Sequence, residues 1–290
     1  MISGPENTRR YLLVGLPETG KTTFLAALWH TVESGEVPGS LCLHRLHGDR
    51  EYLNKIRNDW LACRKLDRTF VQSEKLVSMQ LREAEGTQIT EVTIPDLSGE
   101  TFRLQWETRQ WSGAYKALAE AAHGGLLFVH PDHVVEPVAI SEANEMMRAL
   151  TGPQEPGQIV THETELTWDP SLAPTHVQLV ELLQFIRPVF VRLHHFRVAV
   201  IVSAWDLVRN GGESPDQWLA HRLPLLYQYL QANSEDLPSR VYGVSAQGGE
   251  LQSDAASLLE HLRPTDRICI TGVDCTAHDI TAPMKWLTTP

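Results

Sequence analysis

The stretch "YLLVGLPETGKTTFLAALW", residues 11–29, decides the fold of this chain. Apolar residues lead into Gly15, four residues follow, and Gly20-Lys21-Thr22 then opens a second apolar run. This spacing fits G-x-x-x-x-G-K-[ST], a loop whose glycines let the chain turn tightly so that backbone N–H groups point at phosphate oxygens. A strand pattern before the loop and a helix pattern after it supply the context that this motif needs. We therefore predict a phosphate-binding loop between a strand and a helix.

The residue types within this loop predict individual roles. The positive end of the following helix favours an anion, and a merely solvated lysine at position 21 would be unfavourable there without one. We expect Lys21 to bridge the terminal phosphates and to serve in catalysis, and the Thr22 hydroxyl to bind Mg²⁺. The positions predicted to contact the nucleotide phosphates are Gly15, Pro17, Glu18, Thr19, Gly20, Lys21, Thr22 and Thr23.

The composition limits the classes of protein to consider. Of the 290 residues, 42% are hydrophobic and 21% are charged, which is typical of a soluble globular chain. The 25 Lys and Arg against 36 Asp and Glu give a net charge of −11, a poor match for nucleic acid or an anionic membrane surface. Four cysteines without a C-x-x-C pair indicate reduced thiols. Because no apolar run reaches about 18 residues, we expect no membrane span. The reduced thiols favour a cytoplasmic protein, and the negative charge leads us to expect no nucleic-acid partner.

Strand patterns predict the fold class. Three apolar runs, at residues 10–15, 124–130 and 196–205, are typical of buried parallel strands. Two alternating runs, at residues 75–86 and 88–96, predict an antiparallel hairpin that turns at Glu85-Gly86. Strands that alternate with helical patterns indicate an α/β fold. We predict three layers around a mostly parallel sheet with one antiparallel hairpin strand.

Helical spacing of apolar residues fills the intervals between these strands. Ser214 and Pro215 are suited to the cap and the first position of one such helix. We predict a single domain over residues 1–290, with a helical insertion near 35–70 and a long Pro-, Gly- and Thr-rich loop near 150–175. The predicted helices lie at residues 22–31, 52–66, 102–122, 175–186, 214–233 and 253–262.

Three further motifs follow the phosphate loop, each after a strand pattern. "VTIPDLSGET" (92–101) contains D-x-x-G, with Asp96 at the strand end and Gly99 before a helix. "VIVSAWDLV" (200–208) ends a buried strand with Ser203-Ala204-Trp205-Asp206, and "RVYGVSAQGG" (240–249) contains Ser245-Ala246-Gln247. Each is weak alone: a type I turn explains D-x-x-G, and an Asp that caps a loop explains Asp206. Their order along the chain carries the argument.

This order resembles the Ras-like P-loop GTPases of the translation-factor-related (TRAFAC) class over about residues 15–250. "GLPETGKTTFLAALWH" and "DLSGE" further resemble the bacterial double-GTPase proteins of conflict systems. The resemblance implies a small-GTPase-like P-loop fold, with Asp96 holding Mg²⁺ through water and the Gly99 N–H at the γ-phosphate. It also implies guanine recognition, since an Asp206 carboxylate can accept from both N1–H and the 2-amino group. The implied base-site residues are Ser203, Asp206, Ser245 and Ala246, whose N–H would bind the guanine O6.

The chain departs from the family pattern at several positions. Ser203 and Ala204 replace the Asn and Lys of N-K-x-D, and Gln247 replaces the Lys of the S-A-K loop. Glu100 stands where the family often has a water-orienting Gln. It is a candidate catalytic residue that could act as a base, repel the γ-phosphate, or simply cap the following helix. Pro17, inside the phosphate loop, reduces the space that an arginine finger would need.

The magnesium-binding Thr of the first switch is predicted to be Thr69, in "LDRTFVQ", although a plain surface Thr explains that residue as well. His130 and His133, with Asp132, could bind a metal, but we favour ordinary loop histidines. We expect a GTP-binding molecular switch with slow or partner-stimulated GTPase activity. Its cofactors would be GTP/GDP and Mg²⁺, and its partner a protein effector or second GTPase. The alternatives are a P-loop ATPase, which would use Asp96 but not Asp206, and a nucleotide-binding scaffold that does not hydrolyse.

Overall fold

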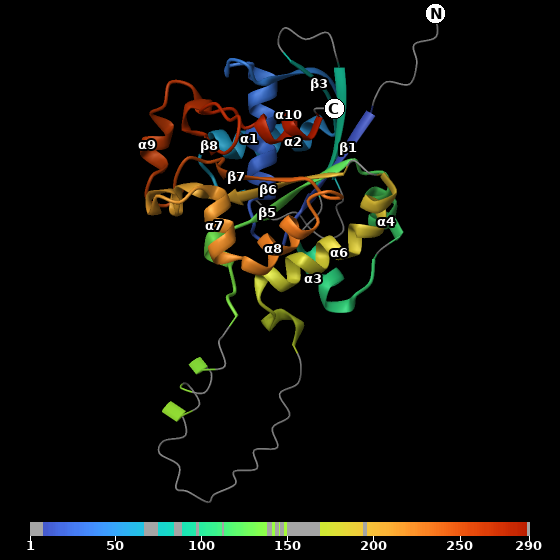
Figure 1. The fold of residues 1–290 in the computed structure, drawn as a ribbon. Helices are drawn as coiled ribbons and strands as arrows, with labels where there is room; N and C mark the ends of the chain where they lie inside the picture. Colours follow the sequence, from blue (N-terminus) through green and yellow to red (C-terminus); the bar gives the residue numbers. More distant parts are fainter. Residues whose placement is uncertain are drawn as a thin grey trace, which may run out of the picture.

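An eight-stranded sheet with the order β2-β3-β4-β1-β5-β6-β7-β8 forms the centre of the computed structural model (Figure 1). The structure describes residues 8–66, 75–83, 89–96, 99–111, 113–137, 141–142, 145, 148–149, 169–193 and 196–288. The strands are β1 Thr8–Val14, β2 Leu41–Gly48, β3 Lys75–Glu83, β4 Ile89–Asp96, β5 Gly124–Val129, β6 Arg197–Ser203, β7 Ser239–Ser245 and β8 Cys269–Thr271.

The five strands β4, β1, β5, β6 and β7 run parallel. All six residues of β5 are buried, as expected for a strand with helices over both faces. Along β1 the side chains alternate: Tyr11 and Leu13 join one core cluster, and Leu12 and Val14 join the other. The predicted mostly parallel α/β sheet is therefore confirmed.

Antiparallel strands lie at both edges of the sheet. The predicted hairpin is present as β3 and β4, paired from Lys75 with Asp96 to Arg82 with Ile89, while its predicted turn lies outside the described residues. β2 adds to β3 in antiparallel sense, and β8 adds to β7. The sequence analysis missed both edge strands, because β2 is only partly buried and interrupts its pairing between Leu43 and Arg45.

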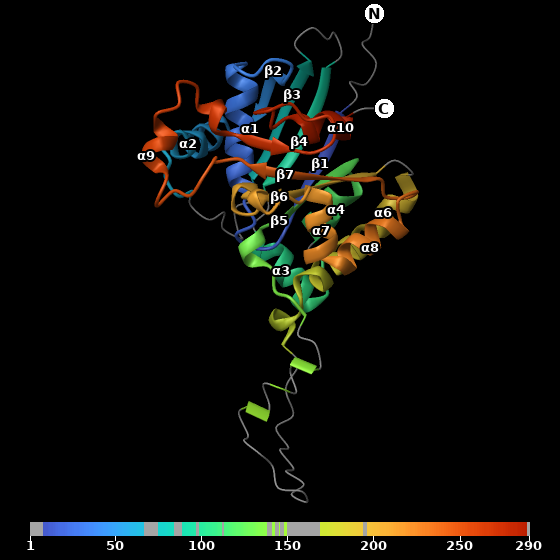
Figure 2. The same cartoon turned by 60° about the vertical axis from the view of Figure 1, so that its left-hand side comes forward.

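Helices cover both faces of the sheet (Figures 1 and 2). α1, α2 and α10 pack on one face, and α3, α4, α6, α7 and α8 pack on the other, so the three predicted layers are present. Among the described residues, no helix is both long and apolar enough to cross a bilayer. The helices are α1 Lys21–Ser34, α2 Arg50–Leu61, α3 Gly99–Thr108, α4 Gly113–Glu120, α6 Thr175–Leu193, α7 Pro215–Arg222, α8 Pro224–Ala232, α9 Ala255–Leu259 and α10 Ala282–Thr288.

Two of the predicted helices are each divided in the structure. The pattern at 102–122 is interrupted after α3, where Arg109 adopts a left-handed φ of 54°. The pattern at 214–233 becomes α7 and α8, since Pro224 lacks the N–H that a continuous helix would need. The start of α7 is as predicted: Ser214 caps it through the Gln217 N–H, in a capping box with Pro in the first turn.

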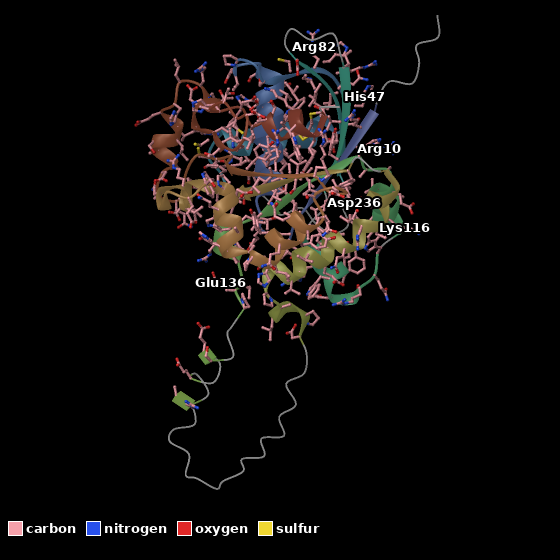
Figure 3. The ribbon with its side chains drawn as sticks, viewed as in Figure 1. Arg10, His47, Arg82, Lys116, Glu136 and Asp236 are labelled. Carbon is pink, nitrogen blue, oxygen red and sulfur yellow. The ribbon has the colours of Figure 1, made fainter. Side chains whose placement is uncertain are left out.

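The region predicted as an insertion near 35–70 contains both β2 and α2. α2 packs on α1, and the indole N–H of Trp29 donates to Asn54 Oδ1 at 3.2 Å across this contact. Of the loop predicted near 150–175, residues 151–168 lie outside the described part. On its two sides, the Val135 N–H donates to Thr175 Oγ1 at 2.8 Å, and Thr175 N–H donates back to the Val135 carbonyl at 2.9 Å. Glu136 follows at the lower edge of the domain in Figure 3.

Candidate nucleotide-binding site

The carboxyl ends of the parallel strands bring the predicted motifs to one edge of the sheet, where α/β folds bind their ligands. The phosphate loop connects β1 to α1. Within it, Glu18 and Gly20 adopt left-handed φ angles of 61° and 81°. Left-handed residues in a short loop curl the chain so that successive N–H groups converge on one point, which suits an anion. For Glu18 this conformation is uncommon, because its Cβ is crowded there.

Two glycines fit the loop closely against neighbouring strands. A Cβ on Gly15 would lie 2.9 Å from the Phe128 carbonyl oxygen of β5, closer than real contacts allow. A Cβ on Gly20 would lie 3.2 Å from Ser203 Cβ at the end of β6. The Ser203 hydroxyl in turn donates to the Val129 carbonyl at 3.0 Å. The loop therefore packs against the ends of β5 and β6, with Ser203 next to Gly20.

Lys21 is 6% exposed, although its side chain is charged. Its Nζ donates to the carbonyl oxygens of Gly15 and Leu16, both at 2.9 Å, and to Thr19 Oγ1 at 3.3 Å. It also lies 5.8 Å from the centre of the Phe102 ring. A buried ammonium group and a helix N-terminus converge here, and both favour an anion. The predicted Thr22 and Thr23 are in the first turn of α1.

At the other end of the site, two separate loops bring together the residues that the sequence predicted for base recognition. Asp206 lies in the 3₁₀ helix Trp205–Leu207 after β6, and Ser245 ends β7. The Ser245 hydroxyl donates to Asp206 Oδ1 and accepts the Gly248 N–H at 3.2 Å. The carboxylate orientation is thus fixed, and Ala246 is the next residue along the chain. The structure brings Ser203, Asp206, Ser245 and Ala246 to the same edge of the sheet.

Trp205 points away from the base site into the core. It is 2% exposed, and a Cβ added to Gly243 of β7 would lie 2.4 Å from its ring. The left-handed φ of 45° at Ala204 starts the turn that sends Trp205 inward. In this tetrapeptide, Trp205 is therefore part of the core, whereas Asp206 lies at the edge of the sheet.

The predicted magnesium and switch residues are only partly described. Thr69 lies outside the described residues. Asp96 ends β4 and Gly99 begins α3, so the backbone order of D-x-x-G is as predicted, but the Asp96 side chain lies outside the described part. Glu100 is paired with Arg103, with 2.7 Å between Oε2 and Nη2. The sequence analysis did not single out Arg103, although its i,i+3 spacing from Glu100 is the signal for such a pair.

Beside the phosphate loop lies a cavity of about 270 Å³. His130 Nδ1 accepts a hydrogen bond from the Asp132 N–H at 3.2 Å. The rings of His130 and His133 pack edge to face, with 4.6 Å between the ring centres. Burial, and then the nearby His133, lower the pKa of His130. Through its bond with the Asp132 N–H, His130 caps the 3₁₀ helix Pro131–His133. The described residues contain no cluster of three or more side chains that could hold a metal. The residues lining the cavity include Leu16, Glu18, Arg103, His130, His133 and Gln178.

Comparison with known proteins gives a family. A sequence model of the Double-GTPase 1 family matches residues 12–287, nearly the whole chain. A search of curated proteins finds no match.

Two solved structures of GTP-binding proteins are similar in part. The GDP-bound Roco2 RocCORdC protein of Methanosarcina barkeri is 12% identical, with a TM-score of 0.34, and the match covers 88% of this chain. The chain spans about half of that protein, 49% of its length. A nucleolar GTP-binding protein 1 from Plasmodium falciparum is 14% identical, with a TM-score of 0.37 and 89% of each chain covered. The family match and the sheet topology together show that this chain belongs to the Double-GTPase 1 family and is a GTP-binding P-loop protein.

Proposed function

We propose that this protein is a guanine-nucleotide switch that binds GTP with Mg²⁺ and hydrolyses it slowly, or on stimulation by a partner. The hydrogen bond from Ser245 to Asp206 carries the proposal. It orients a carboxylate at the end of β6, on the same sheet edge as the phosphate loop. A carboxylate accepts from guanine N1–H and the 2-amino group together, whereas adenine has no such pair of donors. An ATPase would have no use for this arrangement.

The phosphates would bind to the N–H groups of the loop and to Lys21. Gly15, Glu18, Thr19 and Gly20 contribute backbone donors, whereas Pro17 has no N–H and contributes only shape. Mg²⁺ would offset the charge of the β- and γ-phosphates. Thr22 would hold it directly, Asp96 through water, and Thr69 once the first switch closes. These three residues provide the hydroxyl and carboxylate oxygens that Mg²⁺ prefers.

The pairing of Glu100 with Arg103 supports slow intrinsic hydrolysis. A free carboxylate beside the γ-phosphate would repel it, but Arg103 holds Glu100 at 2.7 Å on an exposed face of α3. While Arg103 holds it, Glu100 would be less available to orient an attacking water. A partner that separates the two side chains would free both for the reaction.

The partner is proposed to be a protein effector or a second GTPase, in the cytoplasm and within a conflict system. Exposed apolar side chains that follow the D-x-x-G segment of Asp96 and Gly99, the second switch implied by the resemblance, support this. Leu104 on α3 is 53% exposed, and Leu172 in the 3₁₀ helix Pro170–Leu172 is 74% exposed. The Trp106 indole N–H links α3 to that helix through the Pro170 carbonyl at 2.8 Å. Because α3 begins at Gly99, a partner bound there would sense the γ-phosphate.

Calorimetry on the purified protein with Mg²⁺ tests the proposal. We expect uptake of GDP and of a non-hydrolysable GTP analogue, and ATP binding at least about tenfold weaker. A preference for ATP would favour the ATPase, and uptake of neither nucleotide would remove the proposal. Phosphate release from GTP then separates a switch from a scaffold. Glu100→Ala should change the release rate and leave GTP affinity within about twofold. No release, alone or with candidate partners, would favour the scaffold.

A further inference from the structure

The C-terminal end of α2 lies directly against the loop that follows β7. Trp60, in the last turn of α2, is fully buried. Its indole N–H donates to the carbonyl oxygen of Ala246 at 2.9 Å. These residues are 186 positions apart in the sequence, so this contact belongs to the tertiary fold. A helix from the insertion region therefore holds the loop that is proposed to read the base.

Gln247 strengthens the same contact from the loop side. Its Nε2 donates to the Trp60 carbonyl and to Cys63 Sγ, both at 3.4 Å. The side chain is thus directed toward α2. Because its amide is engaged there, Gln247 acts as a tie between the loop and the helix.

A buried arginine completes the contact. Arg267 is 5% exposed, and its guanidinium lies 4.0 Å from the centre of the Trp60 ring. It donates to the Trp60 carbonyl at 2.6 Å and to Cys63 Sγ at 3.1 Å. A cation stacked on an indole ring and bonded to a helix-terminal carbonyl fixes both the ring and the end of the helix. The indole N–H therefore has a defined direction toward Ala246.

We propose that α2 is part of the base-recognition site and that Trp60 is a positioning residue for guanine. This rests on the proposed function, together with the expectation from the family resemblance that the Ala246 N–H contacts the guanine O6. Ser245 is held on one side of Ala246 by Asp206 and Gly248. Trp60 holds the carbonyl on the other side. With the Ser245 side chain held on one side and the Ala246 carbonyl held on the other, the Ala246 N–H is preorganised, and guanine binds with a smaller entropy cost of ordering the loop.

Trp60→Phe tests this, because it keeps an aromatic ring under Arg267 and removes only the N–H donor. Trp29→Phe is a matched control: Trp29 is another fully buried tryptophan, at the contact of α1 with α2, and its N–H donates to Asn54 instead of the loop after β7. A fluorescent GDP derivative would be displaced by GDP and, separately, by inorganic pyrophosphate, with Mg²⁺ present. GDP uses the base site and the phosphate loop, whereas pyrophosphate uses the phosphate loop alone.

We expect Trp60→Phe to weaken the inhibition constant of GDP about fivefold, the effect of losing one hydrogen bond, and to leave that of pyrophosphate within about twofold. Trp29→Phe should change neither constant by more than about twofold. Equal GDP constants for the two variants, or a parallel loss for pyrophosphate, would overturn the role of Trp60. If Trp60→Phe does not fold, Gln247→Leu removes the other tie, and unchanged GDP binding then overturns the proposal. A wild-type protein that binds no fluorescent GDP instead contradicts the proposed function itself.

Discussion

The phosphate end and the base end of the nucleotide site are held together by different kinds of contact. At the phosphate end, Lys21 bonds to Gly15, Leu16 and Thr19, all within six residues along the chain. At the base end, Asp206 bonds to a residue 39 positions away, and Ala246 to one 186 positions away. In a contiguous loop, the glycines and the lysine of the motif determine the shape directly, so they cannot change without altering it. A site assembled from distant segments can keep its geometry while individual motif residues change, and here the base motifs have changed.

Removing the lysine breaks the phosphate end with the largest expected effect. In Lys21→Ala, the affinity for both GDP and GTP should fall about hundredfold, because charge-assisted bonds to the terminal phosphates are lost. The loss should be equal for ATP, since the lysine does not contact the base. Calorimetry measures this, with exposed Lys116→Ala on α4 as the control (Figure 3). Affinity retained within threefold would place the nucleotide elsewhere.

A methyl group at Gly248 tests how strictly the base end depends on its backbone. Gly248 has a left-handed φ of 94°, and a Cβ there would lie 2.4 Å from the Arg267 carbonyl oxygen. Gly248→Ala should lower the free energy of unfolding by about 2–4 kcal/mol, from strain and overlap together. Gly212→Ala is the control, since its φ is 77° with open space around it, and it should cost about 1–2 kcal/mol. Urea denaturation measures both, and equal losses would contradict a tightly packed loop.

Changing one carboxylate tests specificity at the base end. Asp206→Asn replaces one acceptor oxygen by a donor and should weaken GTP binding about tenfold to thirtyfold, while ATP binding changes less than about twofold. Exposed Asp236→Asn (Figure 3) controls for the loss of a negative charge. Competition between the two nucleotides on each variant gives the ratio. If GTP and ATP weaken by the same factor, Asp206 does not select the base.

The smallest effect concerns His130, which lies between the two ends. Its pKa is lowered, mainly by burial and then by His133, against opposing effects of Asp132, Asp206 and Glu18. As the pH falls, His130 therefore gains its proton in the unfolded chain before it does so in the folded protein. The contribution of neutral His130 to the free energy of unfolding is present above about pH 6.5 and is lost as the pH falls through the lowered pKa. Unfolding at pH 7.5 and 5.5 should show a difference of less than about 1 kcal/mol attributable to this residue, because its side chain is partly solvated.

His130→Asn should reduce that pH dependence, and exposed His261→Asn should leave it unchanged. Measurement on nucleotide-free protein avoids a contribution from phosphate titration. A steeper pH dependence in His130→Asn would mean that the histidine gains a proton on folding, contrary to its surroundings.

The strand, loop and helix at the phosphate end were predicted because the sequence pattern that specifies them is contiguous, although the packing of the loop against β5 and β6 is not visible in that pattern. Gly15, Gly20 and Lys21 are close in the chain, and the apolar patterns of β1 and α1 flank them. The hairpin β3–β4 and the Ser214 cap were predicted for the same reason. The edge strands β2 and β8 were not, because partly exposed or very short strands have weak periodicity.

Other features depended on partners that a linear pattern does not reveal. Trp60 lies within the helix predicted at 52–66, but its contact with Ala246 depends on how α2 and the loop after β7 meet in space. The division between α7 and α8 was missed although Pro224 was visible, because the apolar spacing continues through it. Asp206 was predicted to reach the same site as Ser245 only because the family order placed both after strands.

The charge that lies over the Trp60 indole has a practical consequence. A guanidinium 4.0 Å from a ring centre perturbs the electronic transitions of that ring, so Arg267 should shift the absorption and emission of Trp60. Subtracting the spectrum of Trp60→Phe from that of the wild type would isolate its signal. The molecule thus carries a built-in optical reporter beside its base loop, which needs no attached dye.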